Sequence, residues 1–133
     1  EIGNHSYTHP HMPLITMPEV RNQIVRTGAL IRNITGQSPY LFRPPFGEYN
    51  QAILNQLASL GYVTIIWTID TLDWKNPGPD AVVSRVVDNA APGAIILMHQ
   101  SAPDTLQGLQ TIITRLKEQG YTFGTVTQVI NPL

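Results

Sequence analysis

The sequence has 133 residues and a mass of 14.7 kDa, about the size of one domain. Its 8 basic and 9 acidic residues give a net charge of −1, so a basic surface for nucleic-acid binding is not expected as the main function. Cysteine is absent, so disulfides and thiolate metal sites are excluded, and any metal site must use histidine and carboxylate side chains. No apolar run is long enough for a membrane-spanning helix.

Helical and strand patterns alternate along the chain. A strand ending near Asn4 is followed by a helix from a capping box at Thr16 and Glu19 to a stop at Gly36. Apolar periodicity predicts three more helices, over residues 51–60, 80–91 and 105–119. Short apolar runs predict strands over residues 40–43, 62–70, 94–99 and 122–126. This alternation predicts an α/β fold with about five parallel strands in one domain.

Three of the four histidines lie in the stretch EIGNHSYTHPHM. His5 and His9 are four positions apart, so on one helical turn both imidazoles would point the same way and could reach one ion. Asn4 and Ser6 could orient these rings through hydrogen bonds. The alternative is a pair of surface histidines without a ligand.

Two imidazoles do not complete a catalytic zinc site, which usually has three protein ligands and a water. Glu1 is a poor third ligand, because on a strand its side chain would point along the sheet. His11 lies between two prolines, off the spacing of the other two, and is interpreted as a loop residue.

Ionisable residues follow the ends of the predicted strands. Arg43 ends one strand, Asp70 ends another, and His99 ends a third. Ligands bind at the carboxyl ends of parallel strands, so these residues indicate a functional edge. Asp70 or Asp73 could pair with His99 as a general acid, and Trp74 could form a flat wall for a sugar or a methyl group. The alternative is a helix-capping aspartate and a core tryptophan.

The segment RPPFGEYN, residues 43–50, contains two prolines and a glycine. Such a rigid turn can present backbone N–H groups to an oxyanion, and Arg43 could hold a carboxylate. The alternative is a purely structural loop.

HSYTH, RPPFGEYN, DTLDW and LMH occur in this order over essentially the whole chain. Together they resemble the polysaccharide deacetylases, carbohydrate esterase family 4, which are metal-dependent hydrolases that deacetylate chitin, peptidoglycan or xylan. The resemblance implies that His5 and His9 bind the metal and that Arg43 pairs with the catalytic carboxylate. It also implies that the backbone N–H of Phe46 binds the oxyanion and that His99, tuned by Asp73, is the general acid. Trp74 and Leu97 would line the acetyl pocket. Phe46 departs from the family, which often has tyrosine there.

The family's first motif, a Thr-Phe-Asp-Asp segment that supplies the catalytic base and the third metal ligand, has no counterpart before His5. We therefore expect residues 1–133 to be an incomplete deacetylase catalytic domain, the C-terminal part of a distorted (β/α)7-type barrel that lacks its N-terminal strands. The expected partner is the N-terminal segment of the same enzyme, which carries the Asp-Asp motif.

The expected function is metal-dependent removal of N-acetyl groups from N-acetylglucosamine in peptidoglycan or chitin. An acetylxylan esterase, a non-catalytic carbohydrate-binding fragment and a structural α/β domain stay open as alternatives. The expected metal is zinc, with cobalt, nickel and manganese as alternatives. The expected ligand is an acetylated polysaccharide or oligosaccharide, with no nucleic acid, and the resemblance implies a secreted or cell-surface protein.

Overall fold

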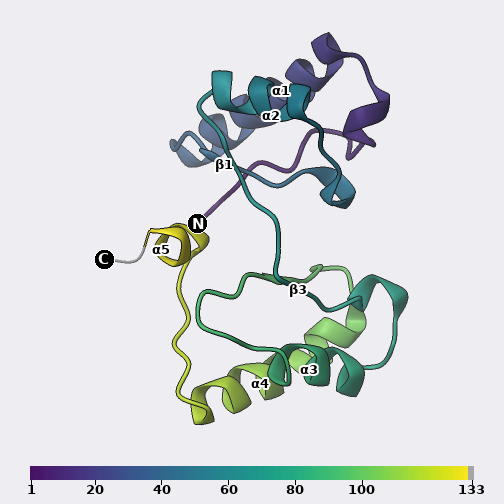
Figure 1. Ribbon diagram of the computed structural model, residues 1–133, viewed down its shortest axis with the longest axis vertical. Coiled ribbons are helices and arrows are strands. Elements are labelled where there is room, and N and C mark those ends of the chain that lie inside the picture. The colour runs from purple at the N-terminus through teal and green to yellow at the C-terminus, as the bar shows by residue number, and fades with distance from the viewer. Residues whose placement is uncertain (132–133) are drawn as a thin grey trace. The chain divides into compact units, whose positions relative to one another are not determined.

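The computed structural model describes residues 1–131, which form two compact units, residues 1–66 and residues 67–131 (Figure 1). The first unit contains, in chain order, the 3₁₀ helix η1 (Met12–Leu14), α1 (Met17–Thr35), β1 (Leu41–Phe42), the 3₁₀ helix η2 (Pro45–Gly47), α2 (Gln51–Ser59) and β2 (Val63–Thr64). The second contains β3 (Ile69–Asp70), the 3₁₀ helix η3 (Asp73–Lys75), α3 (Pro79–Val87), β4 (Ile96–Leu97), α4 (Pro103–Glu118) and α5 (Val126–Ile130).

In the first unit, β1 pairs in parallel with β2, and a parallel bridge joins Asn4 to Phe42. Helices α1 and α2 lie side by side (Figure 1). Their apolar faces and β1 enclose a core of buried residues: Met12, Val20, Ile24, Phe42, Ile53 and Leu57. The bridge places His5 next to the end of β1, where Arg43 follows.

A buried polar contact explains a glycine in the middle of α1. The side chain of Asn4 is almost fully buried, and its amide donates to the carbonyl of Ile24 at 2.8 Å and to the hydroxyl of Tyr62 at 3.1 Å. A Cβ on Gly28 would lie only 2.5 Å from that hydroxyl. Gly28 therefore provides room for the tyrosine that fixes Asn4, and with it the backbone before His5.

In the second unit, β3 pairs in parallel with β4, with Ile69 opposite Ile96. Helices α3 and α4 lie side by side (Figure 1), and they approach closely at Gly108, where a Cβ would lie 3.1 Å from the side chain of Val83. The core of this unit consists of buried aliphatic residues: Ile69, Val82, Val83, Val86, Val87, Ile112 and Leu116.

The predicted α/β fold with parallel strands is confirmed, and the four predicted helices are present. The strands are shorter than predicted. Residues 1–131 contain four strands of two residues each and the bridge at Asn4, in place of about five full strands. The barrel stays a prediction.

The predicted single strand over residues 62–70 is wrong, because this segment changes partners. The backbone N–H groups of Val63 and Ile65 donate to the carbonyls of Tyr40 and Phe42, along β1 of the first unit. Those of Thr68 and Ile69 donate to the carbonyl of Ile95 in the second unit. The run therefore forms two short strands, β2 and β3, separated by residues 65–68, which are not strand residues.

The predicted strand over residues 122–126 is also wrong. Residues 122–125 have no regular structure, and Val126 begins the short helix α5. Thr125 and Gln128 form a capping box, in which the hydroxyl accepts from the Gln128 N–H and the Gln128 side chain accepts from the Thr125 N–H. This local pair of hydrogen bonds favours a helix over the extended form that the β-branched residues suggested.

Candidate functional site

His5 and His9 lie close together, although not for the predicted reason. Their segment is not helical, since Ser6 has φ 67° and His9 has φ 57°. A tight turn with left-handed residues instead brings the rings to a centroid distance of 4.9 Å, with an interplanar angle of 73°. The expected helical turn is wrong, but two imidazoles do face one another.

Side chains hold the backbone of this turn. Asn4 accepts from the Ser6 N–H at 3.0 Å, and the Ser6 hydroxyl accepts from the His9 N–H at 3.1 Å. Asn4 and Ser6 therefore fix the backbone of the turn, and within the described residues no hydrogen bond joins them to the two rings, contrary to the prediction. The buried side chain of Gln23 accepts two more N–H groups, those of Tyr7 and Thr8. Gln23 was not predicted from the sequence. A polar residue three positions after Val20, on the apolar face of α1, is the signal that could have identified it as a buried hydrogen-bonding residue.

The ring of His5 has a defined tautomer. Its Nδ1 lies 2.6 Å from the backbone carbonyl of Arg43, and because a carbonyl can only accept, Nδ1 must carry the proton. In the neutral imidazole, Nε2 then holds the lone pair, as in histidines that bind metals through Nε2. His5 and His9 thus fit two positions of a metal site. Within residues 1–131, no group of three metal-binding side chains occurs, so a third ligand is not supplied by the described chain.

Arg43 and Phe46 lie on the segment that follows β1. The Arg43 side chain is half-buried, burial lowers the pKa of its guanidinium, and it forms no ion pair with a described residue. Phe46 has φ 57° in the turn η2, between Pro45 and Gly47. Its backbone N–H donates no hydrogen bond to a described residue.

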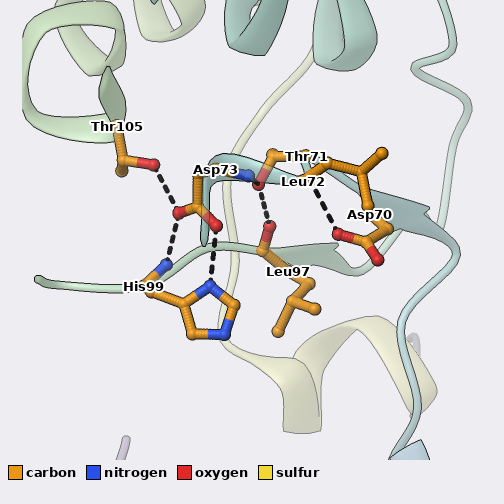
Figure 2. A network of polar contacts seen from close by, with 7 residues as sticks. All are labelled: Asp70, Thr71, Leu72, Asp73, Leu97, His99 and Thr105. Atoms are coloured by element: carbon orange, nitrogen blue, oxygen red, sulfur yellow. Dashed lines mark hydrogen bonds and ion pairs between the residues drawn. The ribbon is translucent and has the colours of Figure 1, made fainter. Parts of the chain in front are cut away.

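In the second unit, the carboxylate of Asp73 gathers three hydrogen bonds (Figure 2). Its Oδ1 accepts from Nδ1 of His99 at 2.7 Å, and its Oδ2 accepts from the His99 backbone N–H at 2.7 Å and from the Thr105 hydroxyl at 2.6 Å. The predicted pairing of an aspartate with His99 is therefore present, and the aspartate is Asp73. Asp70 instead accepts from the backbone N–H of Leu72 at 2.9 Å, which shapes the loop.

The charge of Asp73 is stabilised although its side chain is fully buried. Burial alone would raise the pKa of Asp73, but the hydrogen bonds from Thr105 and His99 and the charge interaction with His99 outweigh it and lower the pKa. A carboxylate at this position holds the Nδ1 proton of His99 and leaves Nε2 to exchange a proton with a substrate. Thr105 was not predicted as a site residue from the sequence; it lies in the first turn of α4, with its hydroxyl against the Asp73 carboxylate.

Two apolar side chains accompany this pair. Trp74 is 56% exposed, with the Lys75 ammonium 4.8 Å from its ring centroid, so it is not the core tryptophan of the alternative interpretation. Leu97 is buried in β4, and its carbonyl accepts from the hydroxyl of Thr71 at 2.8 Å, as Figure 2 shows. Thr71 thereby ties the loop that carries Asp73 to the strand that precedes His99.

A cavity of about 940 Å³ in the second unit lies elsewhere. It is lined by the loop before β4 and by residues 120–129, with no carboxylate, imidazole or basic side chain in its wall. It flanks the start of β4, whereas His99 follows the end of that strand. This cavity therefore offers no acid–base chemistry.

Comparisons with known proteins point to one family. Residues 1–65 match the family model described as polysaccharide deacetylase. A peptidoglycan-N-acetylglucosamine deacetylase of Bacillus cereus is 36% identical over 129 residues, covering 94% of this chain and 47% of its own length.

Two solved structures are similar over almost the whole chain. A family 4 carbohydrate esterase pseudoenzyme of Bacillus anthracis has a TM-score of 0.94 at 42% identity, covering 98% of this chain and 46% of its own. A family 4 carbohydrate esterase of Streptomyces lividans, in complex with acetate, has a TM-score of 0.88 at 37% identity, covering 92% of this chain and 64% of its own.

The chain therefore spans less than half the length of its Bacillus cereus relative and of the Bacillus anthracis structure. Over residues 1–131, no helix has both the length and the apolar character needed to cross a membrane.

Proposed function

The chain is related in sequence and structure to the polysaccharide deacetylases of carbohydrate esterase family 4, and on this premise we propose that it carries part of the site of a metal-dependent deacetylase. The observation that carries the proposal is the hydrogen bond between Asp73 and Nδ1 of His99, a buried carboxylate that prepares an imidazole for proton transfer. The substrate is an N-acetylglucosamine-containing polysaccharide.

His5 and His9 would hold the metal, together with a carboxylate supplied from outside residues 1–133. A divalent metal polarises a bound carbonyl and lowers the pKa of a bound water, which is the chemistry that acetyl hydrolysis requires. Zinc suits two imidazoles and one carboxylate, and cobalt, nickel and manganese are alternatives. The protonated Nδ1 of His5, fixed by the Arg43 carbonyl, supports this assignment because it leaves Nε2 as the donor atom.

His99 acts as the general acid in this proposal. Asp73 holds Nδ1, so that the proton on Nε2 of the charged ring can be delivered to the leaving amine nitrogen. The backbone N–H of Phe46 donates to the developing oxyanion, and Arg43 pairs with the carboxylate that serves as the base. Trp74 and Leu97 enclose the acetyl methyl group.

Peptidoglycan is the preferred substrate in this proposal, because relatives include peptidoglycan-N-acetylglucosamine deacetylases of Bacillus cereus and Listeria monocytogenes. Chitin presents the same N-acetyl group. An acetylxylan O-acetyl esterase is an alternative within the same chemistry, since a bifunctional xylanase/xylan deacetylase of Cellvibrio japonicus is 37% identical over 121 residues. Action on peptidoglycan implies that the protein is located at the cell wall, either secreted or attached to the cell surface.

A non-catalytic carbohydrate-binding role is the second candidate. One specific observation favours it: the Bacillus anthracis structure with a TM-score of 0.94 is that of a pseudoenzyme, and a mutant of it has restored enzymatic activity. His5, His9, Asp73 and His99 are nevertheless all present in this chain. Any loss of activity would therefore originate in residues outside these four.

The test measures acetate release by the complete enzyme that contains this chain, on N-acetylglucosamine oligosaccharides, peptidoglycan and acetylxylan. His99→Ala is expected to lower turnover by about 100-fold or more with the metal content unchanged, whereas the exposed Gln107→Ala is expected to have no effect. Chelation is expected to abolish release, and added zinc or cobalt to restore it. Full turnover without His99 or without metal would refute the proposal, and sugar binding with no acetate release would favour the non-catalytic role.

A further inference from the structure

The two imidazoles of the first unit are held in different ways. The ring of His5 is anchored by its hydrogen bond to the Arg43 carbonyl, whereas the ring of His9 forms no hydrogen bond with any described residue. The His9 ring instead makes edge-to-face contacts, with His5 at 4.9 Å and with Phe46 at 4.6 Å. Its orientation therefore depends on the position of the Phe46 ring.

The Phe46 ring is half-exposed and needs support of its own. His11 provides it by stacking on the ring at a centroid distance of 4.0 Å and an interplanar angle of 8°. His11 is in turn fixed by Glu48, whose Oε2 lies 2.8 Å from its Nδ1. Contacts thus run without interruption from Glu48 through His11 and Phe46 to His9.

We propose that His11 and Glu48 are positioning residues that fix the imidazole of His9 through the ring of Phe46. This inference rests on the proposed function, in which His9 holds a metal. Histidines that bind metals are usually oriented by a hydrogen bond from the second ring nitrogen to a neighbouring acceptor. His5 has that hydrogen bond, and for His9 the stacked rings take its place. His11 was interpreted from the sequence as a loop residue only.

The first experiment records the imidazole C–H signals of the metal-free chain by NMR at one fixed pH. Loss of the stack in His11→Ala is expected to shift the His9 signals most, because the ring current of Phe46 acts on them. The His5 signals are expected to shift less, because the Arg43 carbonyl holds that ring while only the neighbouring His9 ring moves. Glu48→Ala is expected to cause a smaller shift in the same direction. His11→Phe keeps a ring against Phe46 and is expected to restore the His9 signals. The control is Leu14→Ala, in the same segment, where the side chain is 82% exposed.

The second experiment titrates Co²⁺ into the complete enzyme that contains this chain, with the same substitutions, because the proposed third ligand lies outside residues 1–133. His11→Ala is expected to weaken cobalt binding by about tenfold, at the lower end of the range for loss of a residue that orients a metal-binding histidine, and His11→Phe to recover most of it. Unchanged His9 signals in His11→Ala, or equal shifts of His5 and His9, would refute the positioning role even if cobalt binds. If the complete wild-type enzyme binds no cobalt, the proposed metal site fails, and the NMR comparison still decides whether His11 orients His9.

Discussion

The buried carboxylate of Asp73 is expected to make stability depend on pH in a defined direction. Asp73→Asn removes the charge but keeps one oxygen, which can still accept from the His99 N–H and the Thr105 hydroxyl. The amide NH₂ then faces Nδ1 of His99, so two donors oppose each other unless the ring changes tautomer. Since a hydrogen bond to a charged group contributes about 1.5–3 kcal/mol, we expect a loss of about 2 kcal/mol at pH 7.

The direction of this pH dependence follows from the lowered pKa of Asp73. The folded state holds this carboxylate as the anion, so its stabilisation is complete above the unfolded pKa of about 4 and is lost as the pH falls through the lower folded pKa. One proton changes the free energy of unfolding by at most about 1.4 kcal/mol per pH unit. The difference between wild type and Asp73→Asn is therefore constant from pH 7 to about pH 5, and shrinks towards zero in more acidic solution.

Urea unfolding at pH 7, 5, 4 and 3, followed by circular dichroism, measures this difference directly. The exposed Asp88→Asn is the matched control, with an expected change below about 0.5 kcal/mol at every pH. If the difference in unfolding free energy between wild type and Asp73→Asn stays constant down to pH 3, or grows in acid, the charge of Asp73 does not stabilise the fold.

Three further substitutions test the contacts around the site. Gly28→Ala is expected to destabilise by about 1 kcal/mol in thermal unfolding, because its Cβ displaces the Tyr62 hydroxyl; in a Tyr62→Phe background the same change should instead stabilise, through helix propensity. Thr71→Val removes the buried hydrogen bond to the Leu97 carbonyl and should cost about 1–2 kcal/mol in urea unfolding. Gln23→Ala removes two acceptor contacts to the His5–His9 turn and should increase amide hydrogen exchange there, whereas unchanged exchange would contradict its role.

The helices could be predicted from the sequence because their signals are local. Thr16 caps α1 by accepting from the Glu19 N–H, and Gly36 ends the helix at φ 74°, both as predicted. The predicted capping box is only half formed, because the Glu19 carboxylate accepts from Asn22 and Gln23 instead. The strands could be placed only roughly, since pairing partners decide where a strand ends. Nothing local to the run of residues 62–70 shows that Val63 pairs with Leu41 and Ile69 with Ile96, on different sheets.

The candidate site shows the same division between local and distant information. The sequence indicated His5, His9, Asp73 and His99 as chemically suited residues, from their types and their places at strand ends. It did not reveal what orients them, because the Arg43 carbonyl lies 38 positions from His5 and Thr105 lies 32 positions from Asp73. A backbone carbonyl also carries no residue-type signature, so no motif could have identified it.

Backbone strain connects these motifs. The non-glycine residues with positive φ are Ser6, His9, Phe46, Leu72 and Asn76, and the first four lie within the histidine, proline-rich and DTLDW motifs. Such conformations cost about 1–2 kcal/mol each and persist only where surrounding contacts fix them.

Glycine would relieve this strain at His9 and Phe46, but it would remove the two rings that contact each other at 4.6 Å. At Ser6, His9 and Leu72, the backbone N–H donates to a nearby side-chain oxygen, from Asn4, Ser6 and Asp70 respectively, which offsets part of the cost. Side chains are therefore retained in left-handed positions where their rings and hydroxyl groups make contacts that glycine could not.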